Sequence, residues 1–153
     1  MHKGLILEKL LITPILLVMG LSGCMSMIQT TAMSARDAAP VPKERLVEYQ
    51  EPDVKRTFPI YVTRDVGMLG GACYLELWVD DTKVGIFDTG ETAKFYIEPG
   101  NHTLEVNWDQ QGKGLCGMTS SPTYQVIRTR EDRPKNAYRL TIIGDKPMVA
   151  VGN

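Results

Sequence analysis

The apolar residues of this chain recur with a period of two from Thr57 almost to the C-terminus, and no other feature constrains the fold as much. Successive side chains of a β-strand point to opposite faces, so this alternation predicts strands with one face on a core. The alternating stretches are residues 58–63, 73–79, 84–86, 92–98, 102–108, 124–129, 137–143 and 149–151. No helical period longer than a turn or two follows residue 57. We therefore predict an all-β domain over residues 56–153, a small antiparallel β-sandwich of about seven or eight strands.

A different pattern precedes this domain, an apolar run from Leu10 to Leu21 that follows the cationic residues Lys3 and Lys9. As a helix the run would be about 18 Å long, whereas a membrane-spanning helix needs about 20 residues. Pro14 also weakens the run as a permanent helix. Its length and its flanking charges are those of a secretion signal, so we predict that residues 1–23 are a signal peptide.

Leu21-Ser22-Gly23-Cys24 follows the apolar run and resembles the lipobox of bacterial lipoproteins, an aliphatic residue and two small residues before a cysteine. The resemblance implies a diacylglycerol on the Cys24 sulfur, cleavage before Cys24, and acylation of the new amino group by a fatty acid such as palmitate. Several acyl chains anchor a protein firmly where one chain would be marginal. Residue 25 is Met rather than the Asp associated with inner-membrane retention, which favours the periplasmic side of the outer membrane. The alternative is an ordinary secreted protein, or a short anchor helix, with an incidental cysteine.

Residues 24–55 show no sustained periodicity, apart from a short helical stretch around residues 43–49. Their first part is small and polar, and the run Ala39-Pro40-Val41-Pro42 leads into a charged stretch that ends at Lys55. Such a composition is typical of a flexible linker. We therefore expect the lipidated N-terminus and a tether over residues 24–55, which would hold the domain off the bilayer.

The chain has three cysteines, an odd number for a secreted protein. A lipid on Cys24 would account for the odd one and leave Cys73 and Cys116. An oxidising periplasm favours a disulfide between these two, which would close a loop of about 44 residues and contribute on the order of 4 kcal/mol. The alternatives are two buried thiols or a metal pair, although two sulfurs without clustered histidines make a poor zinc site.

Residues 63–108 resemble the small β-sandwich of bacterial lipoproteins of unknown function that are related to PEGA-type surface domains. The order of elements carries the resemblance: a Val-Asp hairpin, a Val-Gly strand, an aromatic-rich strand, and then Pro-Gly-x-His-x-Leu at residues 99–104. The sequence departs from that pattern at Asp81, where a hairpin glycine is usual, and in the added loop at residues 112–117. The resemblance covers under a third of the chain and implies a non-catalytic envelope module without a cofactor.

Charge and motifs argue against several other functions. The chain has 17 basic and 18 acidic residues, so no strongly basic surface for nucleic acid is expected. Residues 112–117 read Gly-x-Gly-x-x-Gly, but the following Ser120-Ser121-Pro122 opens no helix, so we expect a loop that presents Cys116. His102 is the single histidine after residue 23, and no motif ties it to a nucleophile and a carboxylate. A hydrolase, like any enzyme, is therefore disfavoured, and no metal site is expected.

Two groups of residues are candidate surface contacts. Arg128, Arg130 and Arg133 lie around the last long hairpin, among acidic neighbours, and would form either a solvated tip or a contact with lipid headgroups, peptidoglycan or an acidic partner. Tyr74 and Trp78 lie on the strand face opposite the core residues, where they would form an exposed aromatic patch or be covered by the tether or a loop.

Together these features predict a membrane-anchored lipoprotein of the cell envelope that acts as a non-catalytic binding or structural module. Its partners would be membrane lipid through Cys24, and an envelope protein or peptidoglycan through the domain. The alternative is an accessory lipoprotein subunit of a larger envelope assembly of the secretion or conjugation type.

Overall fold

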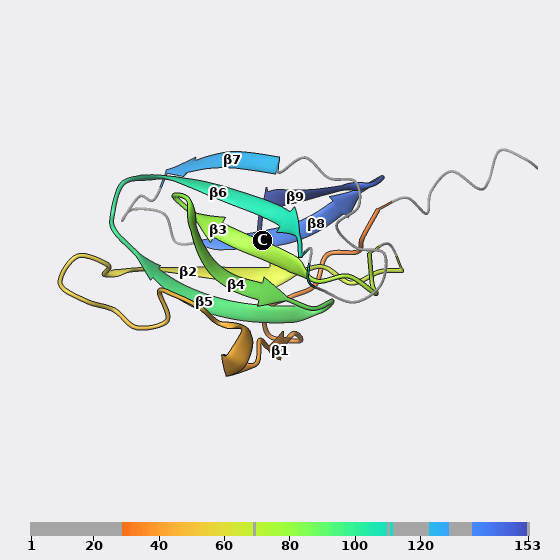
Figure 1. Ribbon diagram of the computed structural model, residues 1–153, viewed down its shortest axis with the longest axis horizontal. Coiled ribbons are helices and arrows are strands. Elements are labelled where there is room, and N and C mark those ends of the chain that lie inside the picture. Colours follow the sequence, from red (N-terminus) through yellow and green to blue (C-terminus); the bar gives the residue numbers. More distant parts are fainter. Residues whose placement is uncertain (1–28, 69, 110, 112–122, 129–135, 153) are drawn as a thin grey trace, which may run out of the picture.

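The computed structural model describes residues 29–68, 70–109, 111, 123–128 and 136–152, and of residues 123–128 the backbone alone. Strands dominate it, as the alternation predicts (Figure 1). The elements are β1 Ala39–Pro40, the short 3-10 helix η1 Lys43–Arg45, β2 Phe58–Arg64, β3 Leu75–Val79, β4 Thr82–Phe87, β5 Glu91–Ile97, β6 Asn101–Trp108, β7 Thr123–Arg128, β8 Ala137–Ile143 and β9 Lys146–Val151. Over these ranges no helix is long and apolar enough to span a bilayer.

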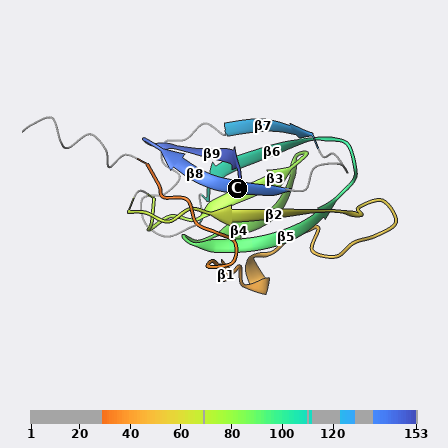
Figure 2. The ribbon, with the colours of Figure 1, turned by 180° about the vertical axis from the view of Figure 1, so that it is seen from behind.

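The strands form two sheets, one in the order β1-β5-β2-β8-β9 and the other in the order β4-β3-β6-β7. In Figure 1 β3, β4 and β6 lie in front of β2 and β8, and the view from behind reverses this order (Figure 2). The inward residues of both sheets make one core, in which Ile60, Leu77, Phe95 and Leu104 have no exposed surface. Burying each such side chain stabilises the fold by about 1.5–3 kcal/mol. The predicted all-β sandwich is confirmed.

The turn between β3 and β4 is a two-residue hairpin loop. Val79 pairs with Thr82, and between them Asp80 and Asp81 both have positive φ angles, 46° and 65°. Two positive φ angles are the mark of a type I′ turn, whose twist matches that of the two strands. Asp adopts this conformation more readily than most residues with a side chain. The chain can therefore dispense with a glycine at Asp81.

Two strand pairs are parallel, which departs from the purely antiparallel sandwich that we predict from the sequence. β2 pairs with β8 in parallel, from Tyr61 opposite Ala137 to Arg64 opposite Leu140, and β1 pairs with β5 in parallel. A parallel pair needs a long connection between its strands. Here the chain between β2 and β8 forms β5 and the whole second sheet, and these strands take the place of a crossover helix.

Residues 29–55 pair with the sandwich and do not form the separate tether that their composition suggests. Thr31 forms an antiparallel bridge with Val66. The N–H of Val41 donates to the Thr92 carbonyl at 2.9 Å, and the Val41 side chain is 5% exposed within the core. Backbone groups of this stretch thereby satisfy the edge of β5. The expected domain boundary at residue 55 is corrected: the folded domain includes residues 29–55.

The later part of this stretch lies along β4 and β5. Leu46 forms a bridge with Gly85, and the N–H of Tyr96 donates to the Tyr49 carbonyl at 2.7 Å. Gly85 has little room for a side chain, because an added Cβ would come within 3.2 Å of the Phe95 ring. The small residue thus permits residues 45–47 to pack close to the edge of the second sheet.

Candidate functional site

The N-terminal segment, residues 29–41, crosses the outer face of the five-stranded sheet. Thr63 lies on the outer side of β2, between the inward residues Val62 and Arg64, yet it is only 4% exposed. Its hydroxyl lies 2.9 Å from the Thr92 hydroxyl on β5. An outward residue of an open sheet would normally contact water, so this burial shows that the N-terminal segment covers part of the face.

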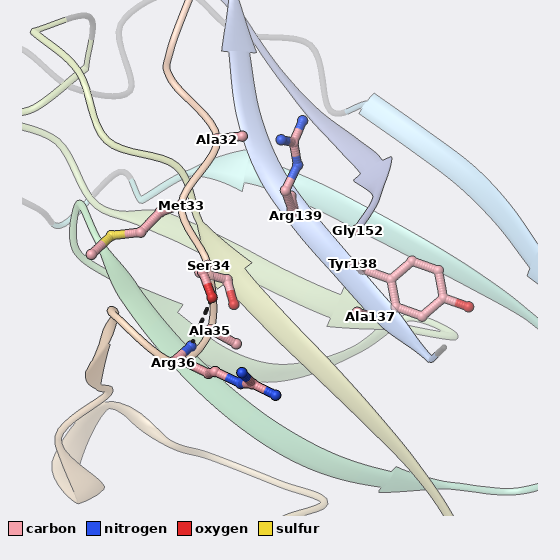
Figure 3. A pocket seen from close by; sticks show the side chains of 10 residues that line it. Ala32, Met33, Ser34, Ala35, Arg36, Ala137, Tyr138, Arg139 and Gly152 are labelled. Carbon is pink, nitrogen blue, oxygen red and sulfur yellow. Dashed lines mark hydrogen bonds between the residues drawn. The ribbon is translucent and has the colours of Figure 1, made fainter. Parts of the chain in front are cut away.

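A pocket of about 440 Å³ lies between the N-terminal segment and β8. Figure 3 shows its wall: the small residues Ala32, Ser34 and Ala35 of the N-terminal segment on one side, and Arg139 of β8 on the other. The segment turns here, because Ser34 Oγ accepts the N–H of Arg36 at 3.2 Å. Arg36 and Arg139 both belong to the lining, so the pocket combines a largely apolar wall with two cationic residues.

A second hollow, of about 460 Å³, lies on the other side of Arg36. Its lining is mainly apolar and includes Val41, Leu46 and the half-exposed ring of Tyr61. Lys94 forms one border of it, with Nζ 5.9 Å from the centroid of the Tyr61 ring. A cation over an aromatic ring is attracted by the negative electrostatic potential of the ring face. The two hollows share Ala35 and Arg36, and we call them together the groove.

Asp65 is the buried charge beside this groove. It is 1% exposed and accepts the N–H of Met33 at 3.4 Å, which ties the N-terminal segment to the end of β2. Burial raises the pKa of Asp65, and Arg139, whose Nε lies 3.7 Å from Oδ1, opposes that rise. Within the described part of the chain, the buried atoms Asp65 Oδ2 and Arg139 Nε have no hydrogen-bond partner. The charge of Asp65 therefore holds Arg139 at the edge of the groove.

The groove suits binding rather than catalysis. Each hollow falls in the size range of small-ligand sites, about 300–1,000 Å³. Arg36, Lys94 and Arg139 surround apolar walls, so a partner with carboxylates and an extended apolar backbone fits this surface best. A peptide or a glycan–peptide strand has both properties.

Tyr74, a sequence-predicted contact residue, is half-buried and lies under Arg45 of η1. The Arg45 guanidinium carbon is 4.9 Å from the centroid of the Tyr74 ring. The same guanidinium forms a two-bond pair with Glu91, which raises the pKa of Arg45. The sequence leaves two alternatives for this position, an exposed aromatic patch or cover by residues 24–55. The second holds for Tyr74, because Arg45 covers its ring.

Trp78, the second sequence-predicted aromatic contact, lies half-buried on the outer side of β3. Its indole N–H donates to Glu76 Oε2 at 3.1 Å. Lys83 Nζ lies 3.1 Å from Glu76 Oε1 and 5.7 Å from the centroid of the Trp78 ring. Trp78 thus belongs to a small polar cluster on the four-stranded sheet, separate from the groove.

Most of the other predicted site residues lie outside the described residues: Cys24, Cys116, Arg130 and Arg133, together with the side chain of Arg128. Cys73 is half-buried two residues before β3. The Cys73–Cys116 disulfide and the arginine contact surface therefore stay predictions.

His102 is held in the turn region between β5 and β6. Its Nδ1 is bonded to Asp80 Oδ2, and its Nε2 lies 2.6 Å from the Glu98 carbonyl. A general base needs one ring nitrogen free to take a proton from a nucleophile. Both nitrogens of His102 face oxygen acceptors, so the residue ties turns together. Throughout the part of the chain that the structure covers, no group of three His, Cys, Asp or Glu side chains could hold a metal ion.

Comparison of the chain with known protein families, with curated proteins and with solved structures gives no match. The lipobox and PEGA-type resemblances stay predictions.

Proposed function

We propose that this chain is a lipid-anchored, non-catalytic binding module of the bacterial cell envelope. The cellular location in this proposal is inferred from the sequence. It rests on the apolar run, on the lipobox-like Leu21–Cys24, and on Met25 in place of the Asp that is associated with inner-membrane retention. These features support a lipidated Cys24 in the outer membrane, with the domain facing the periplasm.

The observation that carries the binding role is the groove on the five-stranded sheet. Its two hollows combine apolar walls with the cationic side chains of Arg36, Lys94 and Arg139. An extended partner that carries carboxylates could lie across Arg36 and reach both hollows. Envelope proteins and the peptide stems of peptidoglycan both offer such carboxylates.

A second candidate is an accessory subunit of a larger envelope assembly of the secretion or conjugation type. The edge of the five-stranded sheet favours it. Among the described strands β9 pairs only with β8, and it exposes Met148 and Val151, which are 37% and 59% exposed. A partner strand could add to this edge. Lys146 and Pro147 at its start would limit such pairing to the C-terminal half of β9.

Photo-crosslinking in intact cells tests the proposed function. A photoreactive aromatic residue replaces Tyr61, which lines the groove, and the matched control replaces Val54, which is 96% exposed in the loop before β2. Both positions are exposed, so neither change disturbs the core. We expect crosslinks to a wall fragment or an envelope protein at residue 61 and not at residue 54.

The amount and nature of the crosslinked partner separate the two candidates. Wall fragments, or a protein captured in small amounts, support the binding module. One protein that co-purifies with the chain in a fixed ratio supports the subunit. Equal crosslinking at residues 61 and 54 would contradict the groove as the binding surface. A screen of the purified chain against ester and glycan substrates tests the disfavoured hydrolase.

A further inference from the structure

The fold shows where the chain enters the sandwich. Gln29 forms an antiparallel bridge with Ile143, the last residue of β8. Thr30 is buried, and its Cα lies 3.3 Å from the position of a Cβ added at Gly67, in the loop after β2. In both views the loop after β2, the β8–β9 turn and the start of the described chain lie at one end of the sandwich (Figures 1 and 2). We call this the entry end.

The entry end is close to Cys24 along the chain. Five residue steps separate Cys24 from Gln29, and a fully extended chain spans at most about 3.6 Å per residue. A lipid on Cys24 would therefore hold Gln29 within about 18 Å of the bilayer surface. This distance cannot be longer, because residues 29–55 are packed on the sandwich and do not lengthen the link between Cys24 and the domain.

Apolar side chains are exposed at the entry end. Met68, in the loop after β2, is 98% exposed, and Ile143 beside Gln29 is 46% exposed. The charges of the β8–β9 turn, Asp145 and Lys146, offset each other. Exposed Met and Ile side chains beside a lipid anchor suit the interface of a bilayer, where apolar groups leave water.

The opposite end of the sandwich has a different character. It carries the loop before β2 and the β3–β4 turn, and its exposed residues include four carboxylates, Glu51, Asp53, Asp81 and Glu98, beside the basic Lys55. Val54 is 96% exposed there. Asp53 holds the loop in place, because its Oδ1 accepts the N–H groups of Lys55 at 2.8 Å and Arg56 at 2.7 Å. Carboxylates repel the anionic headgroups of a bilayer.

We propose that the entry end lies against the bilayer that holds the lipidated Cys24, with Met68 and Ile143 at its interface. This inference rests on the proposed lipid anchor. It places the β3–β4 turn and the loop before β2 away from the membrane. The groove then runs along the side of the domain, open to the periplasm.

Two matched variants test this orientation, Met68→Trp and Val54→Trp. Both residues are almost fully exposed, so a larger ring displaces no packing. They lie beyond opposite ends of β2, whose seven residues span about 23 Å. The mature lipidated chain is reconstituted in vesicles whose acyl chains carry bromine, which quenches indole fluorescence at short range. The parent chain, which keeps Trp78 and Trp108, supplies the background for both variants.

We expect strong quenching of the added indole in Met68→Trp, with a shift of its emission to shorter wavelength. Val54→Trp should show neither, because its indole stays in water. Equal quenching of the two variants, or stronger quenching at residue 54, would overturn the orientation while leaving the anchor intact. Flotation of the vesicles is measured on the same samples. A lipidated chain that does not float with them would overturn the anchor and the orientation together.

Discussion

An Arg64→Leu chain is expected to lose more than about 3 kcal/mol of its free energy of unfolding. Arg64 is 1% exposed and donates to three backbone carbonyls, those of Cys73 at 2.6 Å, Phe87 at 2.7 Å and Gly70 at 2.8 Å. Leucine would fill much of the space but would take the charged donor from all three carbonyls, of which that of Gly70 also accepts a further bond, from the Cys73 N–H at 2.9 Å. A small domain has only about 5–15 kcal/mol to lose, so urea denaturation at neutral pH should show a markedly lower midpoint.

Arg64 stays charged although it is buried, and its hydrogen bonds to the three carbonyls are strong because the donor is charged. Burial lowers the pKa of Arg64 to about 10, and the nearby carboxylates of Asp88 and Glu91 act in the opposite direction. The guanidinium is therefore charged at neutral pH, and hydrogen bonds from a charged donor contribute about 1.5–3 kcal/mol each.

Arg56→Leu is the matched control for Arg64. Arg56 pairs with Asp53 at the surface, with 31% of its side chain exposed, and such pairs contribute about 0–1 kcal/mol. If Arg64→Leu and Arg56→Leu shift the urea midpoint equally, the role assigned to Arg64 is wrong.

Removal of the N-terminal segment is expected to cost about 3–6 kcal/mol of stability. A chain that begins at residue 42 lacks the buried Val41 side chain and the strand pairing of β1 with β5. It also lacks Thr30, whose hydroxyl lies 2.9 Å from the Thr141 hydroxyl and accepts the N–H of Ile142 at 2.9 Å. Thermal unfolding followed by circular dichroism measures the loss.

A chain that begins at residue 29 is the control for this truncation, because it keeps every described contact of the segment. It should unfold at the temperature of the chain that begins at Met25. If the chain that begins at residue 42 is equally stable, residues 29–41 are a tether after all. The same pair tests protease protection, which the packed segment should show and a tether should not.

The strands of this fold could be predicted from sequence because their signal is local. The alternation of Leu75, Leu77 and Val79 between half-buried neighbours is the burial pattern that β3 shows. The hairpin at Asp80-Asp81 could likewise be predicted, because turn residues stand between two alternating stretches. Each of these features depends on residues within about one strand of each other.

The N-terminal segment could not be predicted in the same way. β1 has only two residues, Ala39–Pro40, which is too short for any period to show. A different signal was present: residues 25–35 contain no charged side chain, whereas exposed linkers are typically rich in charge, glycine or proline. Small residues such as Ala32 and Ala35 suit a segment that lies close to a sheet.

Arg64 and the groove depend on contacts that no local pattern reports. An arginine in an alternating strand is normally predicted to point outward into solvent. Arg64 is instead buried and donates to backbone carbonyls at three separate positions. The groove likewise joins Arg36 to Arg139, from opposite ends of the chain. Their proximity depends on the path of the N-terminal segment over β2 and on the parallel pairing of β2 with β8, and the alternation specifies neither.

Incorporation of a labelled fatty acid into wild type and Cys24→Ala tests the central claim, the lipid anchor, most directly. Ser22→Ala is the matched control, since it keeps a small residue in the lipobox-like sequence. We predict that wild type and Ser22→Ala carry the label and sediment with membranes, and that Cys24→Ala does neither. An unlabelled wild type, or a Cys24→Ala chain that still sediments with membranes, would contradict the account.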